Sequence, residues 1–130
     1  MIRGFTQKEG ADYTETFCPI VKMTIIRSPI ATAIKKHLPI YQMNVNSAFL
    51  HGDLYEDIYM KPSQGLHVYP SNTVCKLKKS LYGLKQASRQ WYAKLSDTLR
   101  DVRFQHSKND YSLFLYTTTQ LHCFACCLCE

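Results

Sequence analysis

Basic side chains are concentrated in one stretch of the second half of the sequence. The densest run consists of Lys76, Lys78, Lys79, Lys85 and Arg89. Ammonium and guanidinium groups pair with phosphate oxygens, so a run of this kind suits the backbone of a nucleic acid. A run of charges is as often an ordinary solvated face, and its spacing alone favours neither interpretation.

The charge of the whole chain points in the same direction. In 130 residues, 16 Lys and Arg stand against 10 Asp and Glu, which leaves a net charge of +6. An excess of positive charge favours a polyanionic partner. Charge alone is equally typical of a merely basic soluble domain, so it predicts no function by itself.

A second group of reactive side chains lies at the end of the sequence. Residues 122–130 contain one histidine and four cysteines, with Cys123 and Cys126 at a Cys-x-x-Cys spacing. Imidazole and thiolate groups are the ligands of structural zinc, but such sites usually draw two separated ligand pairs around a folded turn. Cys75 and His106 are the candidates for a distant pair, and nothing in the sequence brings them close to the tail.

No segment suited to membrane insertion or secretion stands out. The sequence contains no apolar run of about 18 residues, the length that a spanning helix needs, and its first residues do not resemble a signal peptide. Cys18 and Cys75 are isolated, so the cysteines do not form a disulfide framework. We therefore expect an intracellular chain, in the cytoplasm or the nucleus, with no membrane partner and no obligate protein partner.

Two stretches have helical periodicity. Apolar residues at helical spacing predict a helix over residues 24–36, with Thr24 as a candidate N-cap, but Pro29 lies inside the pattern. An interior proline removes a backbone hydrogen bond, so we expect this helix to be kinked, late-starting or unstable. A second, amphipathic helix is predicted by the stripe of Ala87, Trp91, Leu95, Leu99 and Val102. This spacing favours core packing of Trp91 over a stacking platform for bases.

Short strands are predicted around these helices. Alternation predicts a strand over residues 40–45, followed by a compact turn at residues 46–49. Residues 58–60 and 74–77 read as the two strands of a hairpin, residues 112–116 as a further strand, and residues 4–12 as the end of a strand followed by a loop. The fold class is therefore α+β, with an antiparallel sheet packed on helices, and the length allows one domain or part of one.

Several long blocks, in the right order, resemble the reverse transcriptase of copia-type LTR retrotransposons, a segment of their Pol polyprotein. Residues 41–54 with 56–60 are similar to the palm strand and turn of that family, and residues 79–92 to the block that follows. The approach from the fingers side is matched by residues 4–7 and 12–17, and the strand after the helix by residues 106–114. The resemblance implies a partial fingers and palm domain over residues 1–116.

What the resemblance implies for chemistry is RNA-templated DNA synthesis on a template–primer of RNA and DNA, with two Mg ions held by carboxylates. Asn44 occupies the position of the family's first metal-binding Asp. A neutral amide oxygen supplies neither the charge nor the bridging capacity that two Mg ions need, so we expect catalysis and Mg binding to be lost. Asp53, Glu56 and Asp57 lie beyond the Gly52 break, and their replacement of the lost carboxylate is not favoured.

The resemblance also implies a nucleotide site and a nucleic-acid surface. Val45, Phe49, Gly83 and Lys85 correspond to the nucleotide-binding positions, where an aromatic ring packs against the incoming sugar and a glycine allows close backbone approach. A phenylalanine at the end of a strand is ordinarily a core residue, and that interpretation of Phe49 stays open. The nucleic-acid-binding positions are Lys76, Lys78, Lys79 and Arg89.

The family continues after the last predicted strand into a Tyr-Val-Asp-Asp segment, which these 130 residues do not contain. Codons TGT, TGT, TTA and TGT for residues 126–129 would read Val-Val-Tyr-Val one nucleotide later, the expected approach to those aspartates. We therefore interpret residues 117–130 as a Cys-rich tail produced by a frameshift between about residues 116 and 123, and favour this over a zinc site. DNA without a Tyr-Val-Asp-Asp-like run in another frame would contradict the hypothesis.

Three functional hypotheses follow. The first is a catalytically inactive remnant of an RNA-directed DNA polymerase. The second is a residual nucleic-acid-binding module without catalysis, which would associate with template–primer in a salt-dependent way. The third is a small zinc-binding or interaction protein that uses the Cys-rich tail.

Overall fold

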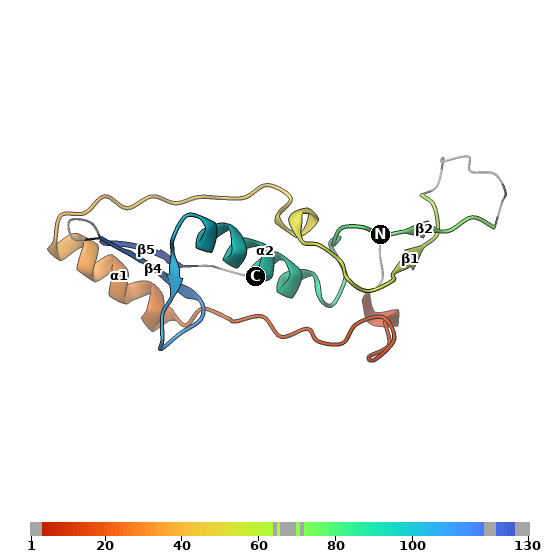
Figure 1. Ribbon diagram of the computed structural model, residues 1–130, viewed down its shortest axis with the longest axis horizontal. Helices are drawn as coiled ribbons and strands as arrows, with labels where there is room; N and C mark the ends of the chain where they lie inside the picture. Colours follow the sequence, from red (N-terminus) through yellow and green to blue (C-terminus); the bar gives the residue numbers. More distant parts are fainter. Residues whose placement is uncertain (1–3, 64, 66–69, 71, 119–121, 127–130) are drawn as a thin grey trace. The chain divides into compact units, whose positions relative to one another are not determined.

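The computed structural model describes residues 4–63, 65, 70, 72–118 and 122–126. Its elements are, in order, η1 (Gly4–Thr6), α1 (Met23–Lys35), η2 (Ala48–His51), β1 (Tyr59–Met60), β2 (Cys75–Lys76), α2 (Ala87–Asp101), β3 (Gln105–His106), β4 (Leu113–Thr117) and β5 (His122–Cys126) (Figure 1). Two α-helices and antiparallel strands confirm the predicted α+β class. No described helix has the length and apolar character of a membrane span.

The chain divides into two compact units. The first unit comprises residues 1–17 and 47–91, and the second comprises residues 18–46 and 92–130. The start of α2 belongs to the first unit and its remainder to the second.

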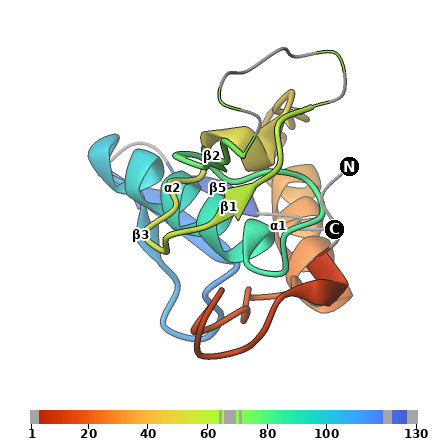
Figure 2. The same cartoon turned by 90° about the vertical axis from the view of Figure 1, so that its right-hand side faces the viewer.

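The first unit is built around the β1–β2 hairpin, which confirms the two predicted strands (Figure 2). Tyr59 is the register partner of Lys76, and Met60 is the partner of Cys75. Beyond the strands, the Leu77 N–H donates to the Ile58 carbonyl at 2.9 Å, which extends the pairing. A small apolar core lies beside the hairpin, and its members are Ile58, Leu84 and Ala87, with Phe49, Leu54, Leu77 and Leu81 packed against them.

The loop between η2 and the hairpin is pressed against α2 within this unit. A Cβ atom at Gly52 would lie 2.9 Å from both the Cβ and the carbonyl carbon of Gln90. That is closer than non-bonded carbon atoms pack at their optimum, about 3.5–4.0 Å. Only glycine therefore lets this loop approach the helix so closely.

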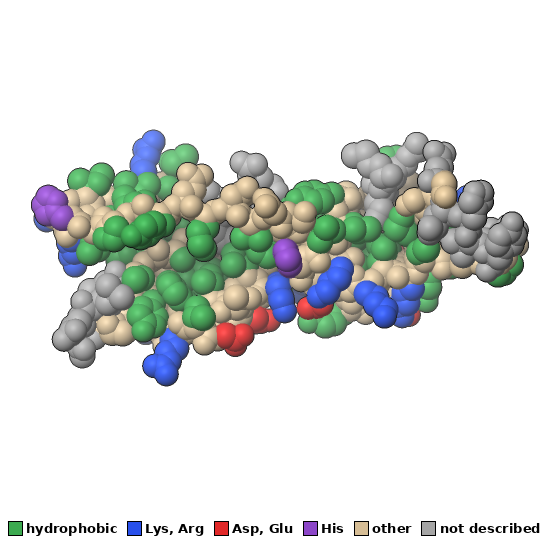
Figure 3. All heavy atoms as spheres, turned by 90° about the horizontal axis from the view of Figure 1, so that it is seen from above, with side chains coloured by type: hydrophobic (Ala, Val, Ile, Leu, Met, Phe, Trp, Pro, Cys, Tyr) green, Lys and Arg blue, Asp and Glu red, His purple; other side chains and the backbone are tan. Residues whose placement is uncertain are grey.

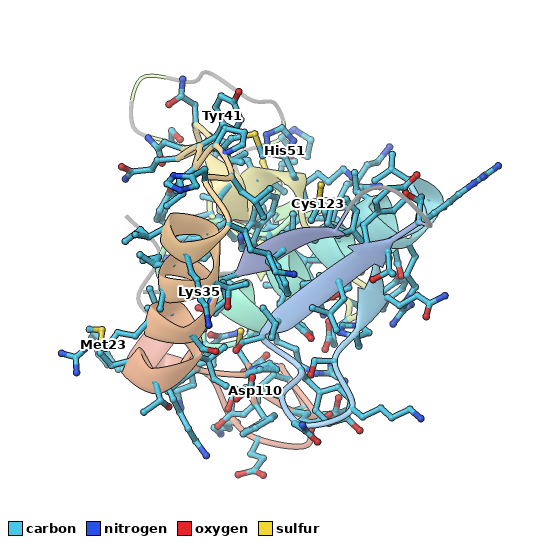
Figure 4. The ribbon with its side chains drawn as sticks, turned by 90° about the vertical axis from the view of Figure 1, so that its left-hand side faces the viewer. Met23, Lys35, Tyr41, His51, Asp110 and Cys123 are labelled. Carbon is cyan, nitrogen blue, oxygen red and sulfur yellow. The ribbon has the colours of Figure 1, made fainter. Side chains whose placement is uncertain are left out.

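The second unit contains a three-stranded antiparallel sheet in the order β3-β4-β5, with α1 against β5. Figure 4 shows α1 between the labelled Met23 and Lys35, near the strand that carries Cys123. Phe114, in the central strand β4, is completely buried. Its ring lies 4.4 Å from that of His106 and 6.4 Å from that of Tyr92, centroid to centroid.

Helix α1 forms as predicted, but the expectation that Pro29 delays its start is wrong, while the expected kink and instability stay predictions. The helix starts at Met23, with Lys22 as its N-cap and no side-chain cap, so Thr24 lies inside the helix. Proline lacks the N–H that would bond to the carbonyl of Ile25. That carbonyl instead accepts from the Cys126 thiol at 4.0 Å, so β5 supplies a weak replacement donor for the missing one.

Helix α2 confirms the prediction from the apolar stripe, except at its end. The helix stops at Asp101, and Val102 is exposed. The reason is a chain reversal at Arg103, whose φ is 69°. This residue is in the left-handed region, which ends the helix before the apolar stripe is complete.

Two strand predictions are wrong. Residues 40–45 form no strand, and Tyr41 and Met43 are 83% and 87% exposed. Alternation specifies a face but not a pairing partner, and no described strand pairs with these residues. Residues 4–12 contain no strand end either, because a 3₁₀ turn over Gly4–Thr6 comes first, closed by the bond from the Gln7 N–H to the Gly4 carbonyl at 3.1 Å.

The sheet also contains residues that the sequence analysis assigned to the Cys-rich tail. Strand β5, His122–Cys126, pairs with β4 from Leu113↔Cys126 to Thr117↔His122. Part of the segment predicted to be a tail is therefore a sheet strand. The frameshift origin of this segment stays a prediction.

Candidate functional site

The predicted catalytic position lies in the second unit. Asn44 and its neighbour Val45 are in the extended stretch that follows α1, and both are exposed. The other predicted nucleotide-binding residues, Phe49, Gly83 and Lys85, lie in the first unit. The contacts of each group are therefore described within its own unit.

Phe49 has the contacts of a core residue. It lies in η2, is half-buried, and packs against the cluster of Ile58, Leu84 and Ala87. Its ring meets that of Tyr82 edge-on, with centroids 4.7 Å apart and an interplanar angle of 62°. Such pairs contribute about 0.5–1.5 kcal/mol beyond the area they bury. The ring therefore has a packing role in this unit, which is the ordinary interpretation of Phe49.

The loop at Gly83 is held by the N-terminal residues. Gly83 has a φ of 95°, a conformation that glycine adopts without strain. A Cβ atom at Gly4 would lie 2.0 Å from the Gly83 carbonyl oxygen, so η1 passes directly over the loop. Two glycines thus bring backbone against backbone at one of the predicted nucleotide positions.

Gln7 connects this loop to the start of α2. Its Oε1 accepts from the Lys85 N–H at 2.9 Å, and its Nε2 donates to Gln86 Oε1 at 3.1 Å. The Gln86 Nε2 in turn donates to the carbonyl of Asp12 at 3.1 Å, and Gln86 is completely buried. The backbone N–H can only donate, so it fixes the orientation of both side-chain amides along the chain of bonds.

Neither glutamine was predicted as a site residue. Gln7 belongs to a polar stretch, and Gln86 precedes the apolar stripe of α2, so neither departs from a local pattern. Their bonds join residues that are 78 and 79 positions apart in the sequence. No signal of periodicity reaches across that separation.

The side chain of Lys85 is engaged by the same N-terminal segment. Its Nζ donates to the Tyr13 hydroxyl and to the Gln7 carbonyl, both at 3.3 Å, and lies 5.0 Å from the centre of the Tyr13 ring. The ammonium group therefore has partners within the first unit. A phosphate at this position would bind an ammonium that is already oriented.

Most of the predicted nucleic-acid-binding residues form ion pairs with carboxylates. Lys76 pairs with Asp57 at 2.5 Å, and Lys79 pairs with Asp53. The hydrogen bond to Asp57 raises the pKa of Lys76 above its usual value.

Arg89 pairs with Glu15 at 2.8 Å, again within the first unit. Lys78 is exposed and has no ion pair with the described residues. In the space-filling view, basic side chains have acidic neighbours on the same face (Figure 3). The basic run is therefore partly neutralised by the protein's own acids.

The acidic residues do not assemble as a metal site. Asp53 and Asp57 are in the ion pairs just described, and Glu56 has one buried carboxylate oxygen without a hydrogen-bond partner. In the described part of the chain, no group of three or more His, Cys, Asp or Glu side chains is arranged to hold an ion. With a neutral amide at Asn44, the donor set does not fit a pair of Mg ions.

The described cysteines of the Cys-rich tail lie in β5. Cys123 and Cys126 are both half-buried, and burial raises the pKa of the Cys126 thiol. Side chains three residues apart on a strand point to opposite faces, so these two thiols do not converge on one ion. Cys127 and Cys129 lie outside the described residues.

The amino-acid sequence is similar to those of known proteins. The family described as "Reverse transcriptase (RNA-dependent DNA polymerase)" matches residues 1–123. The "Retrovirus-related Pol polyprotein from transposon TNT 1-94" of Nicotiana tabacum is 46% identical over 111 residues, which is 85% of this chain. The corresponding protein from transposon RE1 of Arabidopsis thaliana is 46% identical over 114 residues, or 87% of this chain.

A more distant relative is the "Transposon Ty1-ER2 Gag-Pol polyprotein" of Saccharomyces cerevisiae, 27% identical over 100 residues, which is 73% of this chain and 6% of that protein. The chain spans only 8% of the length of the two plant polyproteins. No solved structure matches it.

Proposed function

The chain belongs to the reverse transcriptase family of retrotransposon Pol polyproteins, and from this membership we propose that it is a catalytically inactive form of the domain that retains affinity for template–primer. The observation that carries the proposal is Asn44, at the position where the resemblance expects the first metal-binding Asp. Members of this family bind a nucleic-acid template and generally use Mg. The proposal therefore concerns two abilities of this chain, metal binding and template binding.

The loss of catalysis follows from charge. Two divalent cations close together are held by anionic oxygens, because carboxylates neutralise the ions and bridge them. The amide of Asn44 has one weakly basic carbonyl oxygen and no charge. Downstream of Asn44, the carboxylates of Asp53 and Asp57 are engaged with Lys79 and Lys76, and one carboxylate oxygen of Glu56, which lies between them in sequence, is buried. The proposal of inactivity is therefore supported by the chemistry of the oxygen atoms that would have to bind the metal ions.

The retained affinity is supported by the basic residues of the first unit. Lys78 is exposed, and the ion pairs of Lys76, Lys79 and Arg89 leave these side chains partly accessible to solvent. When accessible Lys and Arg side chains contact phosphates, they release the cations condensed on the nucleic acid, and this release drives non-specific binding. A net charge of +6 attracts the same partner over a longer range.

Primer extension tests the catalytic half of the proposal. The purified chain and an Asn44→Asp variant are incubated with an RNA template, a labelled DNA primer, deoxynucleotides, and Mg or Mn. We expect no extension by the chain, with an active reverse transcriptase as the positive control. Extension by the unmodified chain, at a level that follows the protein through purification, would overturn the proposal.

A binding titration tests the other half. Fluorescence anisotropy of a labelled RNA–DNA duplex is measured at increasing salt concentrations. We expect an association constant that falls as salt rises, with a slope of about −0.9 for each phosphate contact on a duplex. No association at 50 mM salt would remove the binding function and leave only the inactive remnant.

A further inference from the structure

The β1–β2 hairpin pairs acids from one side with bases from the other. Asp53 and Lys79 face each other in an isolated antiparallel bridge, and their side chains form an ion pair. Farther along, Lys76 reaches Asp57 at 2.5 Å. Both acids precede β1 and both lysines lie in or after β2, so the backbone pairing itself places each carboxylate at an ammonium group.

Both ion pairs lie in contact with solvent. The side chains of Lys76 and Asp57 are 52% and 65% exposed, and those of Lys79 and Asp53 are 51% and 43% exposed. Exposed ion pairs contribute little to stability, because water and salt screen them. An incoming phosphate can therefore replace either carboxylate at a small cost in free energy.

A third lysine, Lys78, lies between the two pairs along the chain. It follows β2, where the chain bends, and it is exposed, whereas Leu77 before it packs toward the apolar core. Lys76, Lys78 and Lys79 are thus three basic residues within four positions, and ammonium groups gathered so closely suit a polymer of phosphates.

We propose that the lysines at and after β2, Lys76, Lys78 and Lys79, bind a phosphodiester backbone and that Asp53 and Asp57 are built-in competitors for phosphate, which nucleic acid must displace from Lys79 and Lys76. Lys78, exposed and without an ion pair among the described residues, is the first contact. The inference rests on the proposed retention of nucleic-acid affinity. It adds that two aspartates limit this affinity.

Displacement has a signature in the salt dependence of binding. When a phosphate replaces an aspartate, the freed carboxylate takes up a cation from solution, which offsets the counterion that the phosphate releases. A single carboxylate holds a cation more loosely than a duplex does, so each competing aspartate reduces the slope of log K against log salt by at most about 0.9. Removal of the carboxylate charge restores the full slope.

The experiment uses the full chain and Asp53→Asn, Asp57→Asn and the double variant, titrated against a labelled RNA–DNA duplex between 50 and 200 mM salt. Asn keeps the shape of the side chain and removes its charge. We expect each substitution to tighten binding about twofold to fivefold, the equivalent of an exposed ion pair. The slope should steepen with each aspartate removed, by at most about 0.9.

Asp97→Asn is the matched control. Asp97 forms an exposed ion pair with Arg100 at 3.0 Å, in the second unit, so its substitution changes the net charge equally without touching the hairpin. A smaller gain for this control than for the hairpin variants supports the inference. Loss of the Asp57→Asn gain when Lys76→Gln is added supports it further, because the carboxylate then has no ammonium group to block.

Two results would overturn the inference, and they differ in what they mean for the proposed function. If the chain binds duplex and all three single Asp→Asn variants gain equally, the aspartates contribute only net charge, and the proposed function stands without the inference. If neither the chain nor any variant binds at 50 mM salt, while circular dichroism shows native secondary structure, both the proposed function and the inference fail.

Discussion

At the scale of single residues, the structure replaces an expectation of free side chains with one of paired side chains. The basic run suggested lysines directed at solvent, yet Lys76, Lys79 and Arg89 each meet a carboxylate. Their partners could not be predicted, because Asp53, Asp57 and Glu15 come from other parts of the sequence. The sequence identifies the charge that is available and leaves its local neutralisation undetermined.

Removal of the Gln7 side chain should destabilise the first unit. A Gln7→Leu substitution leaves the Lys85 N–H and Gln86 Oε1 without their partners, and Gln86 is fully buried. We expect the free energy of unfolding to fall by about 1–3 kcal/mol, the cost of unsatisfied buried groups. Hydrogen exchange at the Lys85 amide should accelerate at the same time.

Gln7→Glu separates the two bonds. Glutamate keeps an acceptor for the Lys85 N–H and loses the donor to Gln86. The Lys85 amide should therefore stay protected in this variant, although the protein is less stable. Equal exchange at Lys85 in the Leu and Glu variants would show that the bond from Lys85 to Gln7 does not form in solution.

At the scale of elements, both α-helices end in the same way. After α1, the Leu38 N–H donates to the Ala33 carbonyl at 2.8 Å across His37, whose φ is 52°. After α2, the Phe104 N–H donates to the Leu99 carbonyl at 2.9 Å across Arg103, whose φ is 69°. These are Schellman motifs, in which glycine is preferred at the left-handed residue.

Arg103→Gly should therefore stabilise the second unit. Glycine adopts a positive φ without the steric cost that a Cβ atom brings, so we expect the free energy of unfolding to rise by about 0.5–1 kcal/mol. Chemical denaturation measures the change. Arg103→Ala removes the same side chain but keeps the Cβ atom, and a gain as large for alanine would contradict the backbone explanation.

The elements also show what the sequence could predict. The two α-helices, the hairpin and β4 follow from periodicity, which is a local property of the chain. The strand predicted for residues 40–45 did not form, and β3 and β5 were not predicted, because a strand also needs a neighbour. Gln105 and His106 in β3 have no alternating apolar pattern, and β5 lies in a segment whose cysteines suggested other chemistry.

The same limit applies to the candidate site. The blocks around Asn44 and around Gly83 were sufficient to identify the family, because long ordered blocks are specific. The bonds of Gln7 and the ion pairs of the hairpin depend on contacts between residues far apart in the sequence. Family membership could therefore be predicted, and the local environment of each site residue could not.

At the scale of the whole molecule, the environment of the second unit shifts the pKa values of two of its groups in opposite directions. In the second unit, the hydroxyl and the N–H of Ser112 both donate to Asp110, and these bonds hold the pKa of Asp110 below its ordinary value of 3.8. In the same unit, burial raises the pKa of Cys126 above its ordinary value of 9.0. Both groups therefore tie the stability of this unit to pH.

The signs of the two effects are opposite. A carboxyl whose pKa is lowered by folding contributes stability above its unfolded pKa, and this contribution is lost as pH falls through the lower folded value. A thiol whose pKa is raised by folding favours the folded state until pH rises above about 9, where the unfolded chain ionises first. The second unit should consequently lose stability at both extremes of pH.

Urea denaturation across this range, with separate probes for each unit, would measure the loss. Asp110→Asn should flatten the acid limb, and Cys126→Ala should flatten the alkaline limb, since each removes the group that titrates. The aromatic signals of Tyr92 and Phe114 report on the second unit, while Tyr82 beside Phe49 reports on the first. If both variants keep the pH dependence of the unmodified chain, other groups determine it and the environments described for Asp110 and Cys126 do not persist in solution.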